Sequence, residues 1–266
     1  MAKYKYRYLF FIQYLGFRFH GWQKQGDLKT VHFMIDKTLP FALGHSSFKT
    51  MGSSRTDAMV SAELSAFELF LHEPIAHDFL AVFNSNLPPD IKALRMVDLE
   101  EYPDFNILQS AINKEYRYYF SSGQKAHPYA SPFIYTELQQ LDTNLMAEGA
   151  KLFEGTHFFG RYGTKTGTNT TLERTITTSE ICECLDFKAG FFPKKVFEYR
   201  VASSGFMRNQ VRLIMGQLLM LGLHQLTLEE IEESLLQSEQ YESLNYIAPS
   251  SGLHLISVQF EGFGQP

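Results

Sequence analysis

The sequence predicts an α+β protein of two related domains, each a mostly antiparallel sheet with helices on one face, with an active-site cleft between them. Strand-like alternation of apolar and polar residues recurs in both halves, and helical segments interrupt the strands without regular βαβ spacing. The chain has 266 residues and is 44% hydrophobic, which is enough for two cores. A break at Tyr102-Pro103-Asp104 predicts domains at residues 1–104 and 105–266.

Elements of the first domain follow from this alternation. A strand is expected over residues 4–14, where every second residue is aromatic or apolar and Lys5, Arg7 and Gln13 lie on the other face. Thr30 can cap a helix that continues to about Leu43, although Pro40 should shorten or kink it. Strands near residues 47–53 and 63–71, a helix at 76–83, a turn at 84–90 and a strand at 91–99 complete this domain.

The second domain repeats the mixture on a larger scale. The expected elements are a strand at residues 114–121, a helix at 142–153, strands at 173–185 and 194–203, helices at 206–223 and 228–237, and a strand at 253–260. Residues 160–174 are rich in Gly, Thr and Asn and predict a flexible loop. Its basic residues, Arg161, Lys165 and Arg174, could contact phosphate groups.

Charge is distributed unevenly along the chain. The formal net charge of −5 excludes a uniformly basic nucleic-acid-binding protein. Yet residues 1–57 contain nine basic and three acidic side chains, whereas residues 213–266 contain seven glutamates and no lysine or arginine. This polarity suggests an anionic partner for one part of the molecule; an uneven scatter without function is the alternative. No apolar run is long enough for a membrane span, so we expect a cytoplasmic protein with no membrane association.

A Gly- and Ser-rich turn at residues 51–62 joins two predicted strands and presents Arg55, Thr56 and Asp57 together. A carboxylate beside a guanidinium stays ionised and can act as a nucleophile, a base or an electrostatic partner. An ordinary Asp-capped turn is the alternative. Arg212 lies in an otherwise apolar helical segment and needs a carboxylate partner, for which Asp57 is a candidate.

Two aromatic residues are candidates for contact with nucleic acid. Trp22, the only tryptophan, is followed by Gln23 and Lys24, and aromatic and basic residues interleaved in a loop suit base stacking and phosphate contact with RNA. A lone tryptophan can equally be a core anchor. Tyr116 lies on the strand face opposite Arg117, where it could stack on a base and offer its hydroxyl for proton transfer, or fill a core.

Other chemistry finds little support in the sequence. Phosphate-binding loops, dinucleotide fingerprints, zinc-protease motifs and nucleophile elbows are absent. Cys182 and Cys184 are too close along the chain for an easy disulfide, and no further cysteine can complete a zinc site with them. The sequence therefore predicts no metal site and chemistry without a cofactor.

Six segments, taken in order, resemble the TruA family of tRNA pseudouridine synthases over nearly the whole chain. They are YLGFRFHGWQKQ from Tyr14, SRTDAMVSA from Ser54, NSNLPPDI from Asn84, KEYRYYF from Lys114, FMRNQVRLIMG from Phe206 and SGLHLISV from Ser251. The resemblance implies isomerisation of uridine to pseudouridine, usually in the anticodon stem-loop at tRNA positions 38–40. It also implies no cofactor and a homodimer whose basic surfaces bind tRNA.

Roles for single residues follow from the same resemblance. Asp57 matches the catalytic aspartate that attacks the target nucleotide, and Arg55 matches the arginine that assists base flipping and contacts phosphate. Tyr116 matches the tyrosine that stacks on the target base and takes the C5 proton. Arg212 matches the arginine that pairs with the aspartate. Trp22, Gln23, Lys24 and Lys165 are the further expected substrate contacts.

Four positions of the chain depart from the family pattern. Leu15 replaces an Asp, Ser54 a Gly or Ala, Met59 a Gly and Ser61 a His. Glycine at position 59 would permit a positive φ or a close approach of RNA, and methionine there is costly if that geometry is required. One interpretation of these departures is therefore an active synthase with an altered RNA target. The other is a non-catalytic RNA-binding or RNA-folding protein on the same scaffold.

Overall fold

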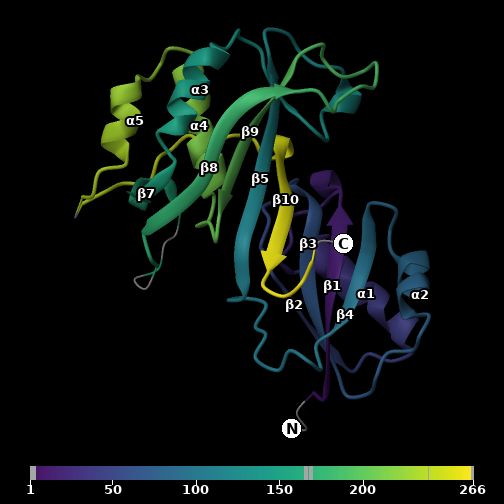
Figure 1. Cartoon of the computed structure of the whole chain (residues 1–266). Helices are drawn as coiled ribbons and strands as arrows, with labels where there is room; N and C mark the ends of the chain where they lie inside the picture. Colours follow the sequence, from purple (N-terminus) through teal and green to yellow (C-terminus); the bar gives the residue numbers. More distant parts are fainter. Residues whose placement is uncertain (1–3, 165–166, 168–169, 239, 265–266) are drawn as a thin grey trace. The chain divides into compact units, whose positions relative to one another are not determined.

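The computed structural model describes residues 4–164, 167, 170–238 and 240–264 (Figure 1). The chain divides into two compact units: unit 1 is Met1–Ile112 with Leu255–Pro266, and unit 2 is Asn113–His254. Each unit combines a mostly antiparallel sheet with helices, which confirms the predicted α+β class. The units differ in two ways from the domains expected at residues 1–104 and 105–266: the first boundary lies after Ile112, and the last segment of the chain returns to unit 1.

Unit 1 contains the sheet order β4-β1-β3, with β2 and β10 also paired to β3. Its elements are β1 (Tyr6–Tyr14), η1 (Gly16–Arg18), α1 (Val31–Leu43), β2 (Phe48–Gly52), β3 (Ser61–Leu71), α2 (Phe79–Asn86), β4 (Ile91–Asp98) and most of β10 (Leu253–Phe260). The strands were predicted to within a few residues. Helix α2 begins three residues later than predicted and continues into the predicted turn.

Helix α1 begins where the sequence placed its cap. The side chain of Thr30 accepts a hydrogen bond from the backbone N–H of Phe33, which satisfies a donor at the helix start. The helix continues through Pro40 to Leu43, so the proline does not shorten it. Gly44 then ends the helix in the left-handed conformation, with a φ of 75°.

Both faces of β1 are buried, which the alternation alone did not predict. On one face, Phe10 stacks on Phe67 of β3, with ring centroids 4.9 Å apart, and contacts Phe83 of α2. On the other face, Leu9 and Phe11 belong to a second core cluster, to which β10 contributes Val258 and Phe260 and the segment after β4 contributes Leu99 and Phe105. This second cluster is why the end of the chain belongs to unit 1.

Unit 2 contains the sheet order β5-β9-β8-β7, with the short strand β6 parallel to β5. Its elements are β5 (Ala111–Ser122), η2 (Pro128–Ala130), β6 (Tyr135–Glu137), α3 (Thr143–Lys151), β7 (Gly155–Phe158), η3 (Gly160–Tyr162), β8 (Glu173–Cys184), β9 (Val196–Ser203), α4 (Gln210–Gly222), α5 (Leu228–Ser234) and η4 (Ser250–Gly252). The three- and four-residue strands β6 and β7 were not predicted. No helix in the described part of the chain is long and apolar enough to cross a membrane.

Helices α3 and α4 pack together on one face of the unit 2 sheet (Figure 1). Helix α4 is buried along most of its length, and Leu213, Ile214, Leu218 and Leu219 are fully inaccessible to solvent. The opposite face of β5, β9 and β8 carries charged side chains. Neighbouring side chains of β5, such as Tyr116 and Arg117, therefore lie on opposite faces of the sheet and in different environments.

The burial of His254 should make the stability of unit 2 depend on pH. It is buried, its ring packs on Tyr119 and its Nε2 lies 2.9 Å from the carbonyl oxygen of Phe133. Burial lowers the pKa of His254 to about 4, against a partial opposing effect of the Phe133 carbonyl. Between pH 6.5 and 4 the unfolded chain therefore binds the proton more readily than the folded one, so stability is complete above pH 6.5 and falls as the pH drops.

The expected loss is up to about 3 kcal/mol over that window. Urea unfolding at several pH values would measure it, with His254→Gln as the comparison, because glutamine can still donate to the Phe133 carbonyl but does not titrate. The variant should have a flatter pH dependence between pH 5 and 6.5. Parallel curves for the two proteins would contradict the assignment of this effect to His254.

Candidate functional site

The loop that carries Arg55 and Asp57 connects β2 to β3 in unit 1. Thr56 between them is buried, and its Oγ1 lies 2.8 Å from the hydroxyl of Tyr14 at the end of β1. Burial raises the pKa of Tyr14, so this hydroxyl stays protonated and available for the hydrogen bond. Thr56 thus holds the loop to the core, while Arg55 is exposed and Asp57 is half-buried.

The segment between β1 and α1 supports this loop through backbone contacts. The N–H of Trp22 donates to the carbonyl of Thr56 over 3.0 Å, and the N–H of Met59 donates to the carbonyl of Phe19 over 3.0 Å. Gly21 has a φ of 83°, and a Cβ atom there would lie 2.7 Å from the Thr56 carbonyl oxygen. A side chain at Gly21 would therefore push the loop away, since real Cβ contacts are not that short.

Ser61, where the family pattern has a histidine, also contributes to this support. Its hydroxyl accepts a hydrogen bond of 2.9 Å from the backbone N–H of Gly16. Neither this contact nor the one between Tyr14 and Thr56 was predicted from the sequence. Buried tyrosine hydroxyls usually have a hydrogen-bond partner, so the tyrosine that ends the first strand was the available signal.

Trp22 is a core anchor, and this corrects its prediction as a residue that stacks on RNA. Only 1% of its surface is exposed, and its indole stacks on the ring of His32 with centroids 5.6 Å apart. The indole also occupies the space beside Gly52, where a Cβ atom would lie 2.3 Å away. The alternative that the sequence left open is therefore the correct one, and the contribution of Trp22 to the site is its backbone bond to Thr56.

Gln23 and Lys24 are exposed, as substrate contacts must be. Lys24 forms an ion pair with Asp36 of α1, and the carboxylate of Asp36 also accepts a hydrogen bond of 2.5 Å from Thr50. Arg18 is paired in the same way with Asp90, at 2.6 Å. The basic character of residues 1–57 is thus partly compensated within unit 1.

Met59 has a positive φ of 68°, so the loop uses the left-handed geometry that glycine would adopt more readily. Left-handed backbone costs a residue with a Cβ atom about 1–2 kcal/mol. We therefore expect Met59→Gly to leave the free energy of unfolding unchanged or to raise it. Met59→Ile should lower it by about 1–2 kcal/mol, because a β-branched side chain tolerates positive φ least.

Chemical denaturation of the two Met59 variants and the wild type would measure this difference. Isoleucine is similar in size to methionine, so the pair separates backbone strain from loss of packing. Equal stability of Met59→Ile and wild type would contradict the strained conformation at this position.

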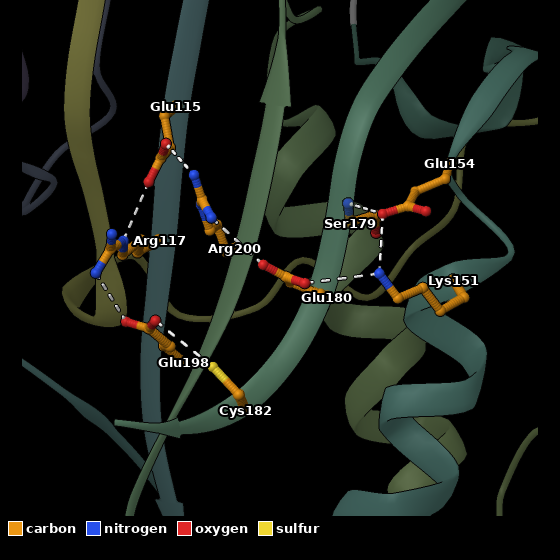
Figure 2. Close-up of polar contacts among 9 residues, drawn as sticks. All are labelled: Glu115, Arg117, Lys151, Glu154, Ser179, Glu180, Cys182, Glu198 and Arg200. Carbon is orange, nitrogen blue, oxygen red and sulfur yellow. Dashed lines mark hydrogen bonds and ion pairs between the residues drawn. The ribbon is translucent and has the colours of Figure 1, made fainter. Parts of the chain in front are cut away.

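Tyr116 lies on β5 in unit 2, opposite Val201 of β9. Its ring meets Phe206 edge to face, with centroids 5.3 Å apart. Its neighbours Glu115 and Arg117 point to the other face of the sheet, where they belong to a network of ion pairs (Figure 2). The strand thus separates an aromatic face, on which Tyr116 lies, from a charged face.

The charged face forms a continuous ladder across three strands (Figure 2). Arg117 pairs with Glu115 and with Glu198 at 3.2 Å each, and Arg200 pairs with Glu115 at 3.0 Å and with Glu180 at 3.4 Å. Burial raises the pKa of Glu115, but hydrogen bonds from Arg200 and Arg117 outweigh it and hold that pKa below its usual value. These charges compensate one another, so the ladder fixes the sheet around Tyr116.

Arg212 lies in the first turn of α4, and its Nε donates a 2.8 Å hydrogen bond to the carbonyl of Ala248. The N–H of Ala248 in turn donates to the carbonyl of Arg212 over 3.0 Å. Helix α4 begins at Gln210, four residues later than predicted, so Arg208 precedes the helix and is exposed. Of these two arginines, only Arg212 is part of helix α4.

The predicted site residues fall in both units. Arg55 and Asp57 belong to unit 1, whereas Tyr116 and Arg212 belong to unit 2. Lys165, the remaining expected phosphate contact, lies outside the described residues. Among the described residues, no group of histidine, cysteine, aspartate or glutamate side chains could hold a metal ion.

Comparison with known proteins decides the family. A family model described as tRNA pseudouridine synthase matches residues 150–261. A tRNA pseudouridine synthase A from Acetivibrio thermocellus is 31% identical over 252 residues, which cover 94% of this chain and 97% of that protein. The chain belongs to the tRNA pseudouridine synthase A family. A tRNA pseudouridine synthase A 2 from Clostridium tetani is 33% identical over 248 residues, covering 92% of this chain and 94% of that protein.

Membership of the tRNA pseudouridine synthase A family confirms the resemblance drawn from the six sequence segments. This is a family of isomerases that act on uridine in tRNA. The likeness covers both units, because the matched relatives align over nearly the whole chain. Arg55 and Asp57 lie on the loop that residues 16–22 support. This segment departs from the family pattern at Ser54, Met59 and Ser61.

Proposed function

We propose that the protein converts uridine to pseudouridine in the anticodon stem-loop of tRNA, at positions 38–40, with Asp57 as the nucleophile. The observation that carries this proposal is the geometry of the loop in unit 1. Thr56 is held inward by Tyr14, the backbone of residues 19 and 22 holds the loop on either side, and Arg55 reaches the solvent. Such a fixed loop suits a nucleophile that must meet an incoming nucleotide in one orientation.

In the proposed reaction, the carboxylate of Asp57 attacks the ribose C1′, so that a bond from Asp57 to C1′ forms as the bond between N1 of uracil and C1′ breaks and the uracil leaves as its anion. The uracil rotates and its C5 attacks C1′, which breaks the bond to Asp57 and releases the free carboxylate. C5 then loses its proton and N1 gains one. We propose that Tyr116 stacks on the base and takes the C5 proton, supported by its position on the aromatic face of β5. Arg55 assists flipping of the nucleotide and contacts phosphate.

Arg212 is the proposed ion partner of Asp57, which keeps the carboxylate ionised. The hydrogen bond from its Nε to the Ala248 carbonyl and its place in the first turn of α4 restrict the orientation of its guanidinium. Gln23, Lys24 and Lys165 are proposed as further RNA contacts. Because the reaction is an isomerisation, it needs no oxidant, reductant or group donor, and we propose that it runs without a cofactor.

A second candidate is the same reaction at another uridine. The observation that favours it is Met59, which places a half-buried side chain two residues after Asp57 where the family pattern has glycine. A larger residue beside the nucleophile restricts the shape of the RNA that can approach it. This alternative changes the position that is modified but keeps the chemistry and the role of Asp57.

Mapping the product in defined transcripts separates these possibilities. Purified protein would be incubated with an unmodified tRNA transcript and with variants in which the uridines at positions 38, 39 and 40 are replaced by cytidine. Mass spectrometry then locates each pseudouridine. We expect modification within positions 38–40 that disappears when those uridines are replaced. Modification that persists at another uridine would favour the second candidate, and binding without modification would favour an RNA-binding protein.

We also propose that the protein acts in the cytoplasm as a homodimer that binds one tRNA. The support is membership of a tRNA-modifying family. Sedimentation equilibrium of the purified chain, alone and with tRNA, tests the assembly. The mass of two chains is expected for the protein alone and the mass of two chains plus one tRNA for the mixture, and a single chain in both samples would contradict the dimer.

A further inference from the structure

Two segments of unit 2 that have no role in the proposed chemistry pack on each other through aromatic rings. Residues 123–134 follow β5 and residues 185–195 connect β8 to β9, at one end of the sheet (Figure 1). Six exposed side chains and the half-buried Phe191 form what we call the aromatic-basic patch: Lys125, His127, Tyr129, Lys188, Phe191, Lys194 and Lys195. None of these residues belongs to a segment that resembles the family motifs.

Tyr129 is the most exposed ring of the patch, and it is nevertheless held in place. Its side chain is 69% exposed, yet its ring packs edge to face against His127 at 4.8 Å and Phe191 at 6.0 Å between centroids. Its backbone N–H donates to Nδ1 of His127 over 3.2 Å. A large aromatic side chain that is both ordered and exposed is typical of a binding surface.

A small core beneath the patch fixes the two segments. Phe191 contacts Phe192 at 4.7 Å between ring centroids, and Phe192 contacts Phe133 and Phe187. Below these rings lies a buried cluster of Tyr119, Ala130, Ile134, Cys184 and Val196. The aromatic-basic patch is thus part of the folded unit, and its rings are preorganised for contact with a partner.

The charge of the patch identifies its partner. The two segments contain four lysines and one aspartate, in a chain whose net charge is −5. Within the described residues, none of the four lysines forms an ion pair, whereas the arginines of the ladder in the same unit are paired with glutamates. Uncompensated lysines around the exposed ring of Tyr129 and the half-buried ring of Phe191 suit a partner that offers both phosphates and flat bases.

We propose that the aromatic-basic patch is a second RNA-binding surface, which stacks unpaired bases of the substrate on Tyr129 and Phe191 while Lys194 and Lys195 contact phosphates. This rests on the proposed function insofar as that RNA is the tRNA substrate. The patch supplies affinity and takes no part in the chemical step. Its loss should therefore raise the Kd and KM for tRNA and leave kcat unchanged.

Matched variants test this surface. Tyr129→Ala removes a ring that is 69% exposed, and Phe41→Ala on α1 of unit 1 removes one that is 71% exposed. Lys194→Glu reverses a charge in the patch, and Lys92→Glu reverses an exposed charge on β4. Binding of an unmodified full-length tRNA transcript would be measured by fluorescence anisotropy at several salt concentrations, after thermal unfolding has shown that each variant is folded.

We expect Tyr129→Ala to weaken binding roughly tenfold, since stacking is the contact it removes. Lys194→Glu should weaken binding by a similar factor of roughly ten and reduce the salt dependence by about one released counterion. Phe41→Ala and Lys92→Glu should bind as the wild type does. An unchanged affinity for RNA in both patch variants would overturn the proposal. If the oligomeric mass of these variants changed at the same time, the patch would be a protein interface.

The outcomes separate this proposal from the proposed function. If the wild type forms pseudouridine and the patch variants bind tRNA normally, the patch proposal fails and the function stands. If the wild type forms no pseudouridine but the patch variants lose affinity for RNA, the function fails and the patch stands.

Discussion

Replacing Asp57 by asparagine is expected to reduce tritium release from C5-labelled uridine in tRNA by at least about a thousandfold. Asparagine has nearly the same shape as aspartate, so the fold of the loop should be kept while the carboxylate that we propose as the nucleophile is lost. Removal of a covalent nucleophile typically costs rates of this order or more. The expected loss lies in kcat, because we propose that Asp57 acts in the chemical step.

Binding should respond differently from turnover in Asp57→Asn. Affinity for RNA comes mainly from contacts with phosphates, so removing one negative charge should leave it unchanged or increase it. Asp104→Asn is a suitable control, because Asp104 is an exposed aspartate of unit 1 outside the loop. Equal tritium release from Asp57→Asn and Asp104→Asn would exclude Asp57 as the nucleophile.

Gly16→Ala is expected to reduce both stability and activity. A Cβ atom at Gly16 would lie 1.9 Å from the carbonyl oxygen of Val60 and 2.9 Å from the backbone nitrogen of Ser61, and these are backbone atoms that cannot rotate away. The loop must therefore move. Overpacking of this kind costs about 1–3 kcal/mol, and a shift of about 1 Å at a reacting group can lower the rate about a hundredfold.

Urea unfolding and tritium release, measured on the same preparations, would quantify the two effects of Gly16→Ala. Gly264→Ala is the matched control, because a Cβ atom at Gly264 meets no atom within 4 Å. Measuring activity well below the unfolding midpoint separates displacement of the loop from loss of the fold. Wild-type stability and activity in Gly16→Ala would contradict the close support of the loop by this segment.

Local patterns in the sequence predicted most of the fold. The cap of α1 at Thr30 and the strand at residues 253–260 came from capping chemistry and alternation, which act between near neighbours. The burial of Leu9 and Phe11 depends on Val258 and Phe260, almost the length of the chain away. No local pattern reports that contact, which is why the return of the chain to unit 1 was not predicted.

The candidate site shows the same division between local and long-range information. Arg55, Thr56 and Asp57 are adjacent in sequence, so their presence on one turn could be predicted. The bond between Thr56 and Tyr14 joins residues 42 positions apart, and the burial of Trp22 depends on His32 and Gly52. The positive φ of Met59 was foreseen only as a requirement of the loop, because residue type alone argues against it.

The central claim is that this chain forms pseudouridine in tRNA with Asp57 as the nucleophile. It is tested most directly by nucleoside mass spectrometry of unmodified tRNA transcripts after incubation with purified wild type or Asp57→Asn. The wild type should produce pseudouridine and Asp57→Asn none, with both proteins binding the transcripts. Equal amounts of pseudouridine from the two proteins, or none from the wild type on any tRNA, would contradict the claim.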